Sequence, residues 1–119
     1  MHDFIDDEVR PLLKRHGLSE FSALWGMQLE AVDAPNIERG GWSSVARFEL
    51  EGEAFYLKRQ INHLTRSWCH PFGEPTFARE FRAIQHYKKM NIPALQAVYF
   101  AQRKQPDGVY AILITRALD

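Results

Sequence analysis

Two stretches of alternating apolar and polar residues, joined by a very short connection, constrain the fold more than any other feature of this sequence. In the first stretch Ala46, Phe48 and Leu50 alternate with charged residues, and the second stretch covers residues 55–59, after the connection at 51–53. A period of two gives a strand one apolar face, and so short a connection joins only neighbouring antiparallel strands. The chain is therefore predicted to build an antiparallel sheet with one buried face.

Three further segments complete the predicted sheet. Residues 27–31 alternate as a first strand, and residues 96–103 and 109–115 form the last two strands. The last two are joined by Gln105-Pro106-Asp107-Gly108, a sequence typical of a β-turn. The prediction is thus a five-stranded antiparallel sheet.

The first 25 residues are predicted to form a short helical extension. Three acidic residues at 6–8 suit the positive end of a helix dipole, and residues 16–17 (His-Gly) suit its end. Ser19 is the expected N-cap of a second helical turn. The residues expected to point inward from these helices are Val9, Leu12, Leu13, Phe21 and Leu24.

One longer helix is predicted between the third and fourth strands. Residues 61–76 have no clean period and contain two prolines, so they are expected to form a loop, and Thr76 is placed to cap the helix that follows. The helix is expected to end at Asn91, before Ile92-Pro93. These elements predict an α+β fold in which residues 1–25 are the extension and residues 26–119 the main domain. The apolar face of the helix is predicted to hold Phe77, Phe81 and Ile84, and its solvated face Arg79, Arg82, Lys88 and Lys89.

The composition fits a single domain. Its balanced charges give no long-range electrostatic field that would attract charged partners. A chain of 119 residues with 45% hydrophobic content can bury a single core. Fifteen basic residues balance fifteen acidic ones, which argues against a nucleic-acid partner. The single Cys69 favours a reducing compartment, and no segment resembles a signal peptide or approaches the ~20 apolar residues needed to cross a bilayer. We therefore expect a cytoplasmic protein.

Lys58 and Glu80 are the strongest candidates for a functional pair. Lys58 lies near the end of a predicted strand, and Glu80 lies on the helix flank that faces the sheet. Taken singly, each has an ordinary interpretation: a lysine that reaches into solvent and a glutamate on an exposed helix face. Taken together, they suggest an ion pair in which the carboxylate holds the flexible ammonium where it can bind a phosphate.

The glycine pair Gly40-Gly41 precedes the second strand and is followed by Ser43 and Ser44. Glycine allows a backbone to approach a phosphate closely, and serine hydroxyls can donate hydrogen bonds to it. A plain hairpin turn is the equally good alternative, because glycine pairs are common in hairpins for conformational reasons. No G-x-x-x-x-G-K-[ST] sequence is present, which excludes a recognisable Walker A loop.

The segment at 62–72 mixes aromatic and basic residues. It is interpreted as a solvated surface loop, and contact with an acidic glycolipid is the alternative. His63, Cys69 and His70 lack the paired spacing and the fourth ligand of a zinc site, so no metal is expected there.

Five segments of the chain together resemble one family of kinases. They are 38–44 (ERGGWSS), 55–59 (FYLKR), 75–81 (PTFAREF), 92–95 (IPAL) and 112–118 (ILITRAL). Their order of glycine turn, strand lysine and helix glutamate is the layout of a protein-kinase small lobe. The segments are similar to the lipopolysaccharide core kinases of the Kdo/WaaP type, and to InaA-like members in particular. The resemblance runs from about residue 26 to residue 119.

The resemblance implies the N-terminal lobe of a kinase that uses ATP and Mg²⁺ to phosphorylate a sugar of the lipopolysaccharide inner core, at the cytoplasmic side of the inner membrane. It implies that Lys58 binds the nucleotide phosphates and that Glu80 holds Lys58. The glycine turn and its serines would cover the phosphates, and residues from 115 onward would begin the hinge that meets adenine. The nucleotide-binding residues implied in this way are Gly40, Gly41, Ser43, Ser44, Lys58, Glu80, Thr115 and Ala117.

Two departures from the family pattern affect the expected activity. Tyr56 stands where most kinases have a small alanine over the adenine, which narrows that pocket or changes its depth, and Ala46, where a valine is usual, is expected to compensate. The catalytic-loop and metal-binding residues of a kinase do not occur before Asp119, so these 119 residues are not expected to transfer phosphate by themselves. The alternative is a noncatalytic lobe that docks to a partner, or to a second copy of itself, through the surface that a large lobe would cover.

Overall fold

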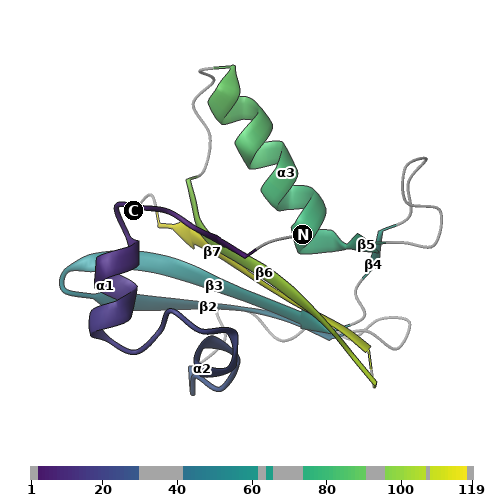
Figure 1. Ribbon diagram of the computed structural model, residues 1–119, viewed down its shortest axis with the longest axis horizontal. Helices are drawn as coiled ribbons and strands as arrows, with labels where there is room; N and C mark the ends of the chain where they lie inside the picture. The colour runs from purple at the N-terminus through teal and green to yellow at the C-terminus, as the bar shows by residue number, and fades with distance from the viewer. Residues whose placement is uncertain are drawn as a thin grey trace.

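Five strands form one antiparallel sheet, in the spatial order β1-β6-β7-β3-β2 (Figure 1). The structure is a computed structural model that describes residues 3–29, 42–61, 64–65, 74–90, 96–106 and 108–117. The predicted α+β fold with a five-stranded antiparallel sheet is confirmed. The five strands are β1 (Phe4–Ile5), β2 (Trp42–Leu50), β3 (Glu53–Ile61), β6 (Ala97–Gln105) and β7 (Gly108–Arg116).

Four of the five strands lie where the alternation predicted them, but the fifth does not. The edge strand is β1, which pairs with β6 and comes from the segment predicted to be only helical. Residues 27–29 were predicted to start a strand and form none. The reason is visible in the hydrogen bonds: the Arg59 guanidinium donates to the carbonyl oxygens of Trp25 and Met27, both at 2.9 Å. A buried side chain thus occupies the Met27 carbonyl, an acceptor that a neighbouring strand would otherwise use, and ties it to the end of α2 at Trp25.

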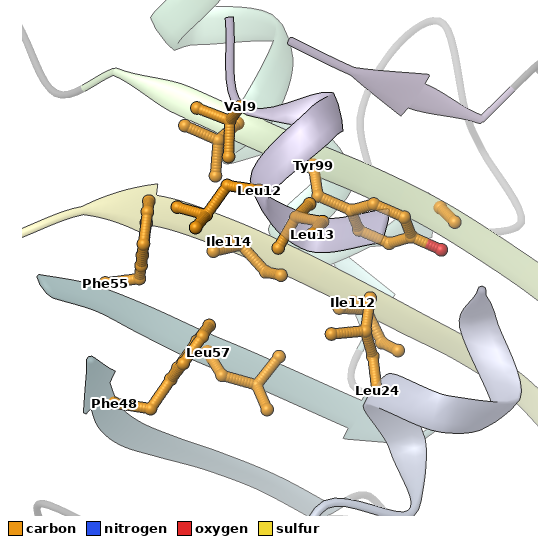
Figure 2. Close-up of a cluster of buried hydrophobic side chains, with 12 residues drawn as sticks. Val9, Leu12, Leu13, Leu24, Phe48, Phe55, Leu57, Tyr99, Ile112 and Ile114 are labelled. Carbon is orange, nitrogen blue, oxygen red and sulfur yellow. The ribbon is translucent and has the colours of Figure 1, made fainter. Parts of the chain in front are cut away.

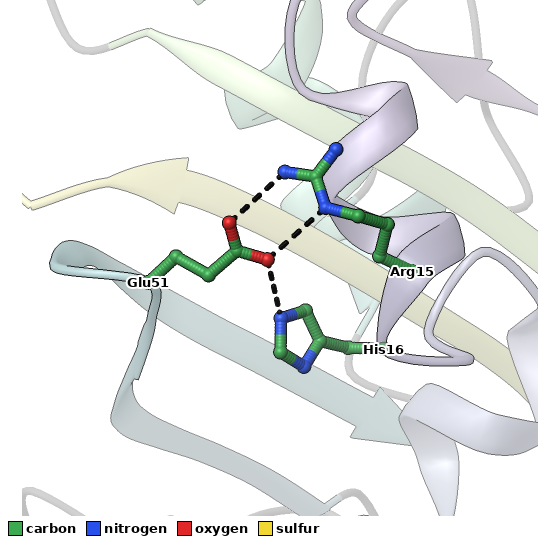
Figure 3. A network of polar contacts seen from close by, with 3 residues as sticks. All are labelled: Arg15, His16 and Glu51. Carbon is green, nitrogen blue, oxygen red and sulfur yellow. Dashed lines mark hydrogen bonds and ion pairs between the residues drawn. The ribbon is translucent and has the colours of Figure 1, made fainter.

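The turn between β2 and β3 has two residues and is fastened to the N-terminal segment. Glu51 has φ 51° and Gly52 has φ 85°, as a two-residue hairpin turn with the twist of the strands requires. The left-handed conformation is unfavourable for Glu51 because it has a Cβ atom. Its carboxylate accepts hydrogen bonds from Arg15 at 3.1 Å and contacts the His16 ring at 2.9 Å (Figure 3). These contacts hold the turn against the end of the first helix.

Two short helices, α1 (Arg10–Arg15) and α2 (Phe21–Trp25), cover one face of the sheet. Leu13 and Leu24 are fully buried there, among strand residues such as Phe55 (Figure 2). The predicted end of α1 at residues 16–17 is confirmed, and Gly17 takes φ 68°. The N-cap of α2 is Glu20, in an extended conformation and without a side-chain bond, so the predicted Ser19 cap is wrong.

The N-terminal segment and the strands share one hydrophobic core. The predicted boundary between a helical extension at residues 1–25 and a main domain at residues 26–119 stays a prediction. The buried members of this core are Val9, Leu12, Leu13, Leu24, Phe48, Phe55, Leu57, Val98, Tyr99, Ala101, Ile112 and Ile114.

The opposite face of the sheet is covered by one helix, α3 (Thr76–Lys89) (Figure 1). Phe81 stacks on Phe100 of β6 with ring centroids 4.8 Å apart, and Leu113 of β7 belongs to the same cluster. The helix begins at Thr76, as predicted, and its predicted end at Asn91-Ile92-Pro93 lies outside the described residues. Within the predicted loop at 61–76, β4 (Leu64–Thr65) and β5 (Glu74–Pro75) pair as a small second sheet.

Replacing Leu13 by alanine tests whether the N-terminal helix belongs to the core. Leu13 is fully buried, so Leu13→Ala should lower the free energy of unfolding by about 2–5 kcal/mol in urea denaturation. Lys14→Ala, on the exposed side of the same helix, should change it by less than about 0.5 kcal/mol. Equal, small effects of the two substitutions would show that α1 is not part of the folded unit.

The contacts of Glu51 predict a specific loss of stability in acid. Hydrogen bonds from Arg15, and then His16, lower the pKa of Glu51 from its usual value. A carboxylate whose pKa is lower in the folded state stabilises that state above the unfolded pKa of about 4.3, and the stabilisation disappears as pH falls through the folded pKa. The melting temperature of the wild type should therefore fall more steeply below pH 5 than that of Glu51→Gln. Parallel melting curves against pH would contradict the contacts seen here.

Candidate functional site

Lys58 and Glu80 form the ion pair that the sequence predicted. The Lys58 Nζ donates to both carboxylate oxygens of Glu80, at 2.8 Å and 3.1 Å. Lys58 comes from β3 and Glu80 from the N-terminal half of α3, so the pair connects the sheet to its covering helix. The side chains are 14% and 35% exposed, which places the pair at the border between the interior and solvent.

The alternation of β3 explains why Lys58 points toward α3. Phe55 and Leu57 point into the core beneath α1 and α2, so Lys58 and its even-numbered neighbours face the other way. In the sheet Lys58 lies between Val45 of β2 and Leu113 of β7. An ammonium group has three donors, and Glu80 takes two of them. For the third donor, no partner is found among the residues that the structure describes.

Of the two serines that the sequence proposed, only one shares a face with Lys58. Ser43 is opposite Gln60 in the β2–β3 ladder and is therefore on the Lys58 side of the sheet. Ser44 is opposite Arg59, on the other side, and is 7% exposed. The structure therefore separates the two hydroxyl groups. Gly40 and Gly41, the proposed glycine cover, lie outside the described residues.

Thr115 and Ala117 lie at the end of β7 beside the same face. Thr115 is opposite Tyr56, so its side chain is on the Lys58 side, where it is 1% exposed. Its hydroxyl has no hydrogen-bond partner among the described residues. An unpaired buried hydroxyl is costly, so a polar group brought by a ligand would be favoured there. The N–H of Ala117 donates to the Ala54 carbonyl at 3.0 Å, which leaves its own carbonyl as the group it can offer.

The expected compensation between Tyr56 and Ala46 is wrong. Tyr56 does lie on the Lys58 face, as the family resemblance implied, and is partly exposed there. Ala46 is opposite Leu57 and is 1% exposed on the other face, so it cannot widen a pocket beside Lys58. The β2 residue that shares the Lys58 face is Val45.

Sequence reasoning assigned no role to Arg59 or Gln60, the two residues after Lys58. Arg59 is 8% exposed, and burial lowers its pKa from the usual value. It lines a cavity of about 480 Å³ with Trp25 and Trp42, on the face opposite Lys58, so that cavity is not part of the Lys58 site. Gln60 is fully buried on the Lys58 face and accepts a hydrogen bond from the N–H of Phe77. It follows two charged residues in β3, so nothing in the local sequence marked it as buried.

No metal centre is formed by the part of the chain that the structure describes. Within those residues no group of three or more His, Cys, Asp or Glu side chains could hold an ion. The three residues considered as zinc ligands, His63, Cys69 and His70, lie outside the described ranges. None of the described helices is long and apolar enough to span a bilayer.

Comparison with known proteins identifies the family of the chain. The model of the lipopolysaccharide kinase (Kdo/WaaP) family matches residues 22–119. The chain belongs to this family. It is 32% identical to protein InaA of Escherichia coli (strain K12) over 97 residues, which are 81% of this chain and 44% of InaA. This is a family of lipopolysaccharide kinases, and the match agrees with the resemblance seen in the sequence.

A solved structure shows the same fold at lower sequence similarity. WaaP in complex with acyl carrier protein superposes with a TM-score of 0.60 and 19% identity, over 99% of this chain. The chain spans 41% of the length of that WaaP chain and 44% of InaA. The arrangement of sheet and helices is thus that of one part of the larger relatives.

Neutralising Glu80 should leave the fold almost unchanged. Because the Lys58–Glu80 pair is partly exposed, Glu80→Gln should change the free energy of unfolding by about 0–1 kcal/mol. Glu53→Gln is a matched control, since Glu53 forms an exposed ion pair with Arg116 at 2.6 Å. Both should be measured by urea denaturation. A loss above about 3 kcal/mol in Glu80→Gln alone would instead indicate a buried structural pair.

Proposed function

We propose that this chain is the nucleotide-phosphate-binding lobe of an ATP-dependent kinase that phosphorylates a sugar of the lipopolysaccharide inner core. The observation that carries the proposal is the two-point contact between the Lys58 ammonium and the Glu80 carboxylate. Membership of the Kdo/WaaP family supports both the kinase chemistry and the lipopolysaccharide substrate.

In the proposed role Lys58 binds a phosphate as a positive point charge. A lysine stem is long and flexible, and two hydrogen bonds to Glu80 keep the ammonium in one place. Its third donor then binds a phosphate oxygen. The Ser43 hydroxyl, on the same face, adds a donor, and Gly40-Gly41 complete the cover over the phosphates. We leave the Ser44 hydroxyl out of this site because it is buried on the other face.

The end of β7 is the proposed place for the base of the nucleotide. The buried Thr115 hydroxyl on the Lys58 face has no partner within the described part of the chain, so a nucleotide that offers it a polar group would satisfy it. Ala117 can offer its carbonyl to the adenine amino group, in the manner of a kinase hinge. Tyr56, opposite Thr115, limits the depth of the base pocket.

Phosphate transfer itself is proposed to need residues from the larger enzyme. Kinases position the acceptor with a catalytic-loop carboxylate and neutralise the phosphates with Mg²⁺, and nearly all of their rate enhancement comes from positioning and electrostatics. The relatives are more than twice as long as the segment matched here, and we propose that their remaining length supplies those groups. The proposed location is cytoplasmic, at the inner membrane, where ATP and the glycolipid acceptor meet.

Titration with ATP and Mg²⁺, followed through backbone amide resonances, tests the proposal. Chemical shift changes are expected at Ser43, Lys58 and the end of β7. Lys58→Met should weaken binding by about 10- to 100-fold, because a hydrogen bond to a charged group is lost. Lys14→Met, on the exposed side of α1, is the control and should bind normally. If millimolar ATP produces no shifts at Lys58, the proposed nucleotide site is rejected and a noncatalytic docking lobe is favoured.

A further inference from the structure

The first turn of α3 is bonded to β3 by a side chain that comes from the strand. Gln60 Oε1 accepts a hydrogen bond of 2.7 Å from the backbone N–H of Phe77, the second residue of α3. The first N–H groups of a helix have no partner within the helix and need an acceptor from elsewhere. Such acceptors usually come from the residue just before the helix, but Gln60 is 17 residues away in sequence. It is also fully buried, so water does not compete for this bond.

Gln60 and Lys58 together contact α3 at two separate points. They are two residues apart on one face of β3, which separates their side chains by about 7 Å along the strand. Their partners, Phe77 and Glu80, are three residues apart, or about 4.5 Å along the helix axis. One contact would leave the helix able to turn about it, whereas two contacts fix how the helix is rotated against the strand.

The apolar contacts of α3 do not supply this orientation toward β3. Phe81 and Ile84 belong to a cluster with Phe100 of β6 and Leu113 of β7. Packing of this kind holds the helix onto the sheet but tolerates small rotations, because it has no fixed direction. A hydrogen bond does have a required distance and angle. Among the described contacts, those with a defined direction between α3 and β3 are made by Gln60 and Lys58.

We infer that Gln60 is a positioning residue: by accepting the Phe77 N–H it sets the rotation of α3 and so brings the Glu80 carboxylate to Lys58. The consequence for phosphate binding rests on the proposed function, but the geometric effect on Lys58 does not. Gln60 itself is two strand positions from Lys58 and acts on it through the helix.

The reactivity of Lys58 toward an acylating reagent measures this effect without any nucleotide. The ammonium held by Glu80 should react slowly with acetic anhydride, as followed by peptide mass spectrometry. Glu80→Gln should speed the reaction. Gln60→Met, which keeps the side-chain length and removes the acceptor, should also speed it by at least about twofold, the lower limit for residues coupled through direct contacts. The internal references are the exposed lysines Lys14, Lys88, Lys89 and Lys104, whose rates should not change.

A double variant separates positioning from general loosening. If Gln60 acts through Glu80, then Gln60→Met combined with Glu80→Gln should label Lys58 no faster than Glu80→Gln alone. If Gln60 only supports stability, the two effects should multiply, and that result would overturn the inference. Leu13→Ala serves as the control for lost stability, because it weakens the core on the other face and should leave Lys58 protected.

Gln102 provides a matched glutamine. Gln60 and Gln102 are both opposite Ala111 of β7, from its two sides, so they lie in one row on one face of the sheet. The Oε1 of Gln102 has no hydrogen-bond partner among the described residues. Gln102→Met should therefore leave the reactivity of Lys58 at its wild-type value. A change as large as that in Gln60→Met would overturn the inference.

Hydrogen exchange in the unmodified chain gives a test that needs no variant. The Phe77 amide should exchange much more slowly than an exposed amide, and fast exchange would overturn the inference even if Gln60→Met failed to fold. Failure of the proposed function gives a different result. A chain that binds no ATP but shows faster Lys58 labelling in Gln60→Met keeps Gln60 as a positioning residue. If the chain binds ATP but Lys58 is labelled at the wild-type rate in Gln60→Met, the positioning role of Gln60 is rejected and the proposed function is kept.

Discussion

The pairing of β3 with β2 on one side and β7 on the other is the interaction on which the rest of the structure depends. Because strand side chains alternate, this register sends Phe55 and Leu57 into the main core and Lys58 toward α3. A shift of one residue would put the lysine into the apolar core and expose the apolar residues. The cost of burying an unpaired ammonium therefore protects the register, and the register in turn fixes the side of the sheet on which Lys58 and the proposed phosphate site lie.

The N-terminal segment makes this two-sided sheet possible. A sheet needs an apolar layer against each buried face, and α1 and α2 supply it beneath β3 while β1 pairs with the open edge of β6. Glu51 joins the β2–β3 turn to the end of α1, so the hairpin that carries Lys58 is fastened at its far end (Figure 3). The face toward α3 carries the second apolar cluster, around Phe81 and Phe100, and the polar pair of Lys58 and Glu80.

The sequence predicted the long strands and the Lys58–Glu80 pair, and the errors have physical causes. Alternation is readable over nine residues, as in β2, but β1 has only two residues and cannot show a period. The compensation expected of Ala46 failed because it was taken from the family pattern without the register of β2 against β3. The turn has two residues and pairs Leu50 with Glu53, so Val45 lies opposite Lys58. Gln60 was not predicted because a contact with a helix 17 residues away leaves no local pattern.

The weakness of the Lys58–Glu80 pair suits the role proposed for it. A fully buried ion pair would be expensive to disturb, since either charge left alone in the interior costs several kcal/mol. This pair is partly exposed and is expected to contribute little to stability, so in the proposed role Lys58 shares its charge with a phosphate without threatening the fold. The helix must then be held by other means, and Phe81 with its apolar neighbours and Gln60, through its hydrogen bond with the Phe77 N–H, do so. The proposal thus assigns stability and ligand electrostatics to different residues of the same helix.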